Sequence, residues 1–197
     1  MERKLLAADH ASLAPRDDLA YAVEHLGSYR PTAEEQARER DRILAFCAEH
    51  SDALHRSCLA GHLTAGALLL DHRGERALLT LHAKLGKWLQ LGGHADGDAN
   101  LPAVALREVT EESGIEGCVI DPRPIDVDVH VIPTYRDVPE HLHLDTTYVC
   151  FAPEGAVPVV SHESTELAWL GYDDVERLNP ERSLLRAYRA AGLGPQS

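Results

Sequence analysis

Three glutamates on one face of a predicted helix are the residues best placed to do chemistry. Glu108, Glu111 and Glu112 are spaced i, i+3 and i+4, so their carboxylates lie side by side. Such close negative charges repel one another, and a divalent cation would compensate, because carboxylate oxygens are ligands that Mg²⁺ prefers. Arg107 adjoins them and can hold one carboxylate by a bidentate hydrogen bond. The alternative interpretation is a solvated helix face.

A glycine-rich segment, Gly92–Asp98, comes immediately before this helix. Gly92 and Gly93 let the backbone approach a ligand closely, and a carbonyl oxygen there can join the coordination shell of a metal ion. Asn100 is the expected N-cap of the helix. Gly114 is its expected end, because glycine readily adopts the left-handed conformation that terminates a helix.

The spacing of these residues resembles the signature of the Nudix family, Gly-x5-Glu-x7-Arg-Glu-U-x-Glu-Glu-x-Gly-U, in which U is an aliphatic residue. Eight of the nine specified positions match. The exception is Ala99, which stands where the signature has its first Glu; Asp98, one residue earlier, is another source of a carboxylate. The matching residues are Gly93, Arg107, Glu108, Val109, Glu111, Glu112, Gly114 and Ile115.

The resemblance implies a fold, a reaction and a cofactor. The fold is a Nudix-like α/β/α sandwich with a mixed sheet, and the reaction is hydrolysis of a diphosphate linkage in a nucleoside diphosphate derivative with Mg²⁺ or Mn²⁺. By the same resemblance, Glu111 and Glu112 are the principal metal ligands. Glu108 is a metal ligand or the base, and Arg107 orients it. The carbonyl group of Gly93 completes the metal's shell.

Members of the family often take a further acid from outside the signature. Glu163, expected on a loop, is the preferred candidate for a catalytic base or an extra ligand. The alternative is that Glu163 is a surface residue without such a role. Glu166 is expected to begin a strand with its side chain in water.

Several residues near the signature are candidates for substrate binding. His94 directly follows the two glycines, and Lys84 and Trp88 precede them. A lysine can meet a phosphate, and Trp88 can stack on a base or fill the core between sheet and helix.

Two further sets of polar residues alternate along predicted strands, so the residues of each set should lie on one face of their strand. A second metal site or a contact with substrate phosphate is one interpretation, and His141 and His143 are therefore candidate pocket residues. The preferred interpretation is the polar, solvent-facing side of an antiparallel hairpin. The patterns are His141, His143 and Asp145 in one strand, and Asp126, Asp128 and His130 in the preceding one.

The composition restricts the classes of function. The chain has 197 residues, 44% of them hydrophobic, and a formal net charge of −13. This acidity argues against general nucleic-acid binding, which needs basic surface. A small phosphorylated substrate remains compatible, because bound metal ions reverse the local charge. The four cysteines form no C-x-x-C pair, and the longest apolar stretch is too short to span a bilayer. We therefore expect a cytoplasmic protein.

The pattern of elements changes near residue 59. Residues 1–58 predict a helical N-terminal extension with two helices. One is expected over 17–26, and the other from Thr32 toward His55. At the start of the second helix, Thr32 and Glu35 are expected to form a capping box. Residues 59–192 predict the Nudix domain. Its expected strands are 63–70, 77–81, 88–91, 124–132, 141–151 and 167–170, and its last helices are 173–178 and 182–191.

Two other functions stay open. An isoprenoid diphosphate isomerase shares the Nudix-like fold but needs a pocket cysteine, and no position here assigns one. A non-catalytic ligand-binding module would usually have lost signature glutamates; Ala99 leaves it open. The substrate and the oligomeric state also stay open, although the extension offers a plausible homodimer surface.

Overall fold

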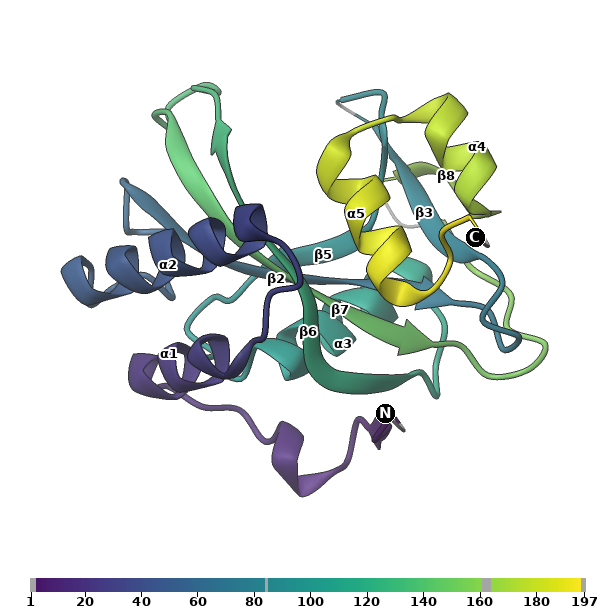
Figure 1. Cartoon of the computed structure of the whole chain (residues 1–197), viewed down its shortest axis with the longest axis horizontal. Helices are drawn as coiled ribbons and strands as arrows, with labels where there is room; N and C mark the ends of the chain where they lie inside the picture. The colour runs from purple at the N-terminus through teal and green to yellow at the C-terminus, as the bar shows by residue number, and fades with distance from the viewer. Residues whose placement is uncertain (1–2, 84, 161–163, 196–197) are drawn as a thin grey trace.

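The computed structural model describes residues 3–83, 85–160 and 164–195, and its centre is an eight-stranded mixed sheet (Figure 1). The strand order is β1-β6-β7-β2-β3-β4, while β5 also pairs with β2 and β8 with β3. Strands β2 and β7 run parallel, and the other described pairs are antiparallel. The strands are β1 (Leu6–Ala7), β2 (Gly61–Leu70), β3 (Ala77–His82), β4 (Trp88–Leu89), β5 (Leu91–His94), β6 (Val119–Ile132), β7 (His141–Phe151) and β8 (Ser164–Leu170).

Helices cover both faces of this sheet. Because alternate residues of a strand point to opposite faces, β2 divides its side chains between two cores. Leu63 and Leu69 share a core with α3, whereas Leu68 and Leu70 share the other with α4 and α5. This arrangement is the expected α/β/α sandwich. The helices are α1 (Leu19–Ser28), α2 (Glu34–Glu49), α3 (Leu101–Ser113), α4 (Tyr172–Leu178) and α5 (Arg182–Ala191), with a short 3₁₀ turn at Ala11–Leu13.

The N-terminal extension contains the expected helices and shares the core of the sheet. Leu26 of α1 and Ile43 of α2 are fully buried in the same core as Val109 of α3. The extension also adds a strand that the sequence did not predict, since β1 pairs with β6. Figure 1 shows α1 and α2 together at one end of the molecule. None of the helices within the described residues is both long and apolar enough to cross a membrane.

The expected starts of the first two helices need correction. The first helix was expected from Asp17, but α1 begins at Leu19 after the N-cap Asp18, whose carboxylate accepts a hydrogen bond from the backbone N–H of Ala20. The N-cap of α2 is Ala33, not Thr32. Gln36 rather than Glu35 closes this end, because its side-chain oxygen accepts from the backbone N–H groups of Thr32 and Ala33.

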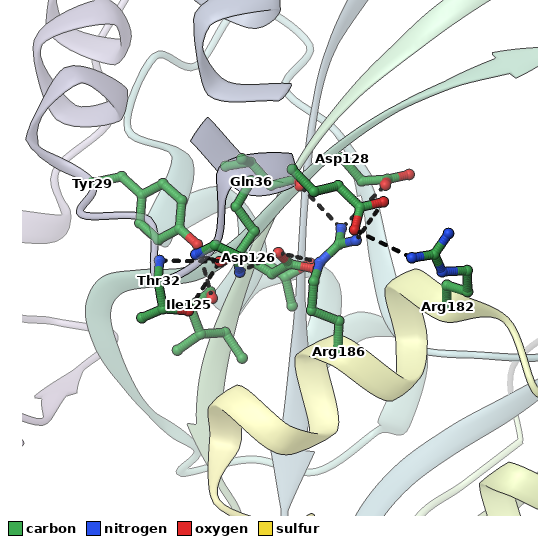
Figure 2. Close-up of polar contacts among 12 residues, drawn as sticks. Tyr29, Thr32, Gln36, Ile125, Asp126, Asp128, Arg182 and Arg186 are labelled. Carbon is green, nitrogen blue, oxygen red and sulfur yellow. Dashed lines mark hydrogen bonds and ion pairs between the residues drawn. The ribbon is translucent and has the colours of Figure 1, made fainter. Parts of the chain in front are cut away.

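A buried ion-pair network joins α2, β6 and α5, and Figure 2 shows Arg186 reaching from α5 toward Asp126 and Asp128. The Arg186 Nε lies 2.9 Å from both carboxylate oxygens of Asp126, and Nη2 lies 3.2 Å from Asp128 Oδ1. The side-chain amide of Gln36 donates to the same Asp126 carboxylate at 2.9 Å. The Asp126–His130 face is therefore not the solvent-facing side of a hairpin: Asp126 is 2% exposed, because α5 covers it.

We predict that Arg186→Met lowers the free energy of unfolding by about 3 kcal/mol, because it leaves the buried Asp126 carboxylate without its counter-charge. The measurement is urea denaturation at neutral pH. The matched control on the same helix is Arg182→Ala, whose side chain is 87% exposed, and which should change stability by less than about 0.5 kcal/mol. Equal losses in the two variants would contradict this account.

Candidate active site

Strand β5 pairs with β2, and two glycines face each other across this pair. Gly92 pairs with Gly66, and a Cβ atom added to Gly92 would lie 2.5 Å from the Cα of Gly66. A Cβ added to Gly66 would lie 2.6 Å from the carbonyl oxygen of Leu91. Both positions therefore require glycine, and the backbone of β5 is fixed tightly against β2.

The next glycine brings β5 into contact with α3. A Cβ on Gly93 would lie 2.3 Å from Glu108 Oε2, so any larger residue would have to displace that carboxylate. The backbone N–H of Gly92 donates to Glu112 Oε2 at 3.0 Å. The sequence placed Gly92, Gly93 and His94 in a loop, but they form β5. The expected close approach is present, and its partners are glutamates of the helix.

Glu108 is the most restrained of the three glutamates. Arg107 Nη2 donates to Glu108 Oε1 at 2.9 Å and to the backbone carbonyl of His94 at 3.3 Å. This is a single hydrogen bond to the carboxylate rather than the bidentate pair expected. Burial raises the pKa of Glu108, Arg107 opposes that rise, and the negative charge of Glu111 adds to it.

The departure at Ala99 has a structural explanation. Ala99 is fully buried, and its backbone N–H donates to the carbonyl of Arg16 at 2.6 Å. One Asp98 oxygen accepts from the backbone N–H groups of Arg16 and Asn100. Asp98 thus ties this loop to the N-terminal extension. Asn100 precedes α3 as expected, yet its side chain makes no capping bond and instead donates to carbonyls of that extension.

The oxygen donors around α3 are of the type that a hard divalent cation takes, although in this structure the three carboxylates do not converge into a metal-compatible group among the described residues. Glu108, Glu111 and Glu112 project from one helix beside the backbone of Gly93. Two observations favour a cation there: Glu108 is half-buried, and its pKa is raised by burial and by Glu111. A cation relieves both effects by stabilising the charged carboxylate. Mg²⁺ and Mn²⁺ match this chemistry, because both take carboxylate and carbonyl oxygens.

The predicted substrate-binding histidines lie together, on the opposite face of the sheet from α3. The ring centroids of His94 and His143 are 5.0 Å apart, and those of His141 and His143 are 5.3 Å apart. His62 lies among all three, with centroids 4.9 to 5.1 Å from theirs. Burial, with a smaller contribution from neighbouring positive groups, lowers the pKa of His94 to about 4 and that of His143 to about 2.

A fifth histidine is held by carboxylates at the edge of this group. His130 Nδ1 lies 3.2 Å from Asp145 Oδ2 and 3.4 Å from Asp128 Oδ2. The hydrogen bond to Asp128 raises the pKa of His130. The other oxygen of Asp145 accepts from the hydroxyl group of Thr64. The two alternating patterns therefore meet across the β6–β7 pair, as a second interpretation of the sequence anticipated.

The remaining candidates lie elsewhere or outside the described residues. Trp88 is in β4, where it packs against the core beneath α4 and α5, and its carbonyl accepts from Asn179. Lys84 and Glu163 fall outside the residues that the structure describes.

Sequence reasoning missed His62. The predicted strand began at Leu63, whereas β2 begins at Gly61, so His62 was left outside the element. The available signal was its period-two spacing from Thr64 within the same strand.

We predict that Gly93→Ala lowers the free energy of unfolding by about 1–3 kcal/mol, because the added methyl group collides with the Glu108 carboxylate. Urea denaturation measures this change. Gly27→Ala is the control, since a Cβ at Gly27 in α1 would meet nothing within 4 Å; this variant should be neutral or stabilised by up to about 1 kcal/mol. A Gly93→Ala protein as stable as the parent would show that this contact is not tight.

Comparisons with known proteins place this chain in a family. The profile of the NUDIX domain matches residues 61–188. The chain is similar in structure to an Ap4A hydrolase of C. elegans, with a TM-score of 0.54 and 16% identity over 66% of this chain and 94% of that one. It is also similar to a candidate asymmetric diadenosine tetraphosphate hydrolase of Jonesia denitrificans, with a TM-score of 0.51 and 17% identity over 70% and 98%. A comparison with curated protein sequences found no match. Because the profile covers well over half of its residues, the chain belongs to the Nudix hydrolase family.

Proposed function

We propose that this protein is a divalent-metal-dependent hydrolase that cleaves the diphosphate linkage of a nucleoside diphosphate derivative, giving a nucleoside monophosphate and a phosphorylated second product. The observation that carries the proposal is the close approach of Gly93 to Glu108, with Glu112 bonded to Gly92. These contacts hold the carboxylates of Glu108 and Glu112 beside the backbone of β5, whose carbonyl oxygens can supply a further ligand. The family match supports the same chemistry.

In this proposal Glu108, Glu111 and Glu112 would hold Mg²⁺ or Mn²⁺, together with the carbonyl group of Gly93. When bound, the metal neutralises diphosphate charge and lowers the pKa of coordinated water. The chain's own contribution is to fix the carboxylates in advance. Glu112 is anchored by the Gly92 N–H, and Glu108 is held between Gly93 and Arg107.

In the alternative role, Glu108 does not bind the metal but accepts a proton from the attacking water, while Glu111 and Glu112 are the ligands. Burial then raises its pKa, which brings a carboxylate closer to the range in which general bases work efficiently. Arg107 limits that rise and orients the group, so that one oxygen faces the guanidinium. Arg107 is thus a positioning residue in this proposal.

Glu163 is proposed as an additional base or ligand, although it lies outside the described residues. The support comes from Val159, four residues earlier in the sequence. Val159 donates its backbone N–H to the carbonyl of Ser113 at 2.8 Å, and a Cβ on Gly114 would lie 3.0 Å from the Cβ of Val159. Val159 is therefore held at the end of α3.

Substrate contacts are proposed for His94, His141, His143, Lys84 and Trp88. The half-buried rings of His94 and His143 lie close together, and His94 follows Gly93 directly in β5. The proteins of similar structure include an Ap4A hydrolase, which adds dinucleoside polyphosphates to the substrates worth testing. A domain division near residue 59, a homodimer and a cytoplasmic location also stay proposals.

The chemistry of the cysteines favours hydrolysis over a cysteine-dependent isomerase. All four cysteines, Cys47, Cys58, Cys118 and Cys150, are buried free thiols. Burial raises the pKa of Cys47 and of Cys118 to about 11, so neither is a ready nucleophile. A non-catalytic module is disfavoured by the three glutamates, while Ala99 contributes packing rather than a lost ligand.

We predict that Glu111→Gln lowers kcat/KM by about 100-fold or more, because it removes one charged ligand of the metal. The assay measures monophosphate release from ADP-ribose, nucleotide sugars, dinucleoside polyphosphates and oxidised nucleotides, with Mg²⁺, Mn²⁺ or EDTA. Glu116→Gln is the matched control, since Glu116 is exposed and lies just beyond the end of α3.

The expected pattern is turnover that EDTA abolishes, that Glu111→Gln impairs and that Glu116→Gln leaves unchanged. A folded parent protein without turnover on any of these substrates would contradict the proposal. Turnover that survives EDTA or the Glu111→Gln change would contradict the role of the glutamates.

A further inference from the structure

Three histidines from three neighbouring strands converge on one point. His62, His94 and His143 each present a ring nitrogen, and the three nitrogens lie within 4.8 Å of one another. His62 comes from β2, His94 from β5 and His143 from β7. This group is separate from the glutamates, because it lies on the opposite face of the sheet from α3.

The register of the sheet explains the convergence. His62 pairs with His143 across the parallel β2–β7 ladder, so their side chains leave the same face next to each other. On the other side of β2, His94 pairs with Thr64, which is two residues from His62. His94 therefore lies diagonally across from His62 on that same face. No loop movement is needed to assemble the group.

The burial of the His62 ring indicates a bound ligand. His62 is 4% exposed, and neither of its ring nitrogens meets the geometry of a hydrogen bond with a residue that the structure describes. The nearby backbone of Cys58 only opposes the fall in the pKa of His62 that burial causes. A buried polar group without a partner destabilises the folded protein. Such groups usually mark a bound water or ion, and three imidazoles at one point favour an ion.

We propose that His62, His94 and His143 form a second cation site, which binds a transition-metal ion of the Zn²⁺ type through three neutral imidazoles. Imidazole nitrogen suits Zn²⁺ and its neighbours, whereas the glutamates around α3 suit Mg²⁺. Three protein ligands leave a fourth position for water or a substrate oxygen, as in catalytic rather than structural zinc sites.

The geometry needs a small adjustment to close around an ion. Nitrogens that share a tetrahedral Zn²⁺ at about 2.0–2.1 Å lie about 3.4 Å apart. The nitrogens here are within 4.8 Å of one another, so no pair needs to approach by more than about 1.4 Å. The half-buried rings of His94 and His143 can supply this by rotation about their side-chain bonds.

Two further histidines, His130 and His141, lie beside the three proposed ligands. His130 is occupied by Asp128 and Asp145, so it supports the site from outside rather than acting as a ligand. His141 Nδ1 lies 2.8 Å from the carbonyl oxygen of Pro139, which orients that ring beside His62. These two residues therefore frame the three proposed ligands.

The test measures Zn²⁺ binding to the full chain after removal of bound metal, with Mg²⁺ in excess to fill oxygen sites. Isothermal titration gives the affinity and stoichiometry, and the visible spectrum with Co²⁺ reports coordination by nitrogen. The variants are His94→Gln and His143→Gln, chosen because His62 is fully enclosed and its replacement risks misfolding. Circular dichroism checks that each variant folds.

Two controls make the assignment specific. His50→Gln alters the other group with metal-compatible spacing, which consists of His50, Asp52 and Cys58. Glu111→Gln alters the proposed Mg²⁺ site. Neither control should change Zn²⁺ affinity, whereas His94→Gln and His143→Gln should each weaken it by about 100-fold or more.

The readout is binding, so it does not depend on the hydrolase proposal. One Zn²⁺ per chain, lost in the two folded histidine variants and kept in both controls, would support the site. The proposal would be overturned by a parent protein that binds no Zn²⁺, by binding that survives both histidine changes, or by binding that His50→Gln or Glu111→Gln removes.

Discussion

The register of β5 on β2 is the constraint on which both candidate sites depend. Gly92 faces Gly66 at a separation that admits no side chain on either residue. Once this pair is fixed, Gly93 points toward Glu108 and His94 toward the opposite face, where His62 lies. A shift by one residue would exchange these faces, because side chains alternate along a strand. One backbone contact thus sets the position of two donor sets.

The two donor sets differ in chemistry, and the sheet keeps them apart. Oxygen donors gather on the α3 face, where burial raises the pKa of Glu108. Nitrogen donors gather on the other face, beyond the part that α5 covers. On that same face, the Asp126–Arg186 ion pair fixes α5 against β6 and leads to the carboxylate Asp128, which holds His130. The excess of acidic residues in this chain is thus in part structural.

The sequence predicted the parts of this arrangement that are local. The signature glutamates lie on one helix, so their spacing alone places them on one face. Gly114 ends α3 in a left-handed conformation, as expected. The β6–β7 hairpin was also predicted, but its register, which pairs Asp128 with Asp145 and His130 with His143, was not.

The parts that depend on long-range pairing could not be predicted. His62 and His143 are brought together by the parallel β2–β7 ladder, which no local pattern specifies. Burial of Asp126 depends on Arg186, a residue of the last helix that sequence spacing does not connect with β6. Ala99 looked like a lost carboxylate, because its packing partners belong to the distant N-terminal extension.

The central claim is that one strand register builds an oxygen site and a nitrogen site back to back. The most direct measurement is anomalous diffraction, at the manganese and zinc edges, from crystals grown with both ions. The account predicts a manganese peak at Glu108, Glu111 and Glu112 and a separate zinc peak among His62, His94 and His143. Both ions at the glutamates, or no peak at either place, would contradict it.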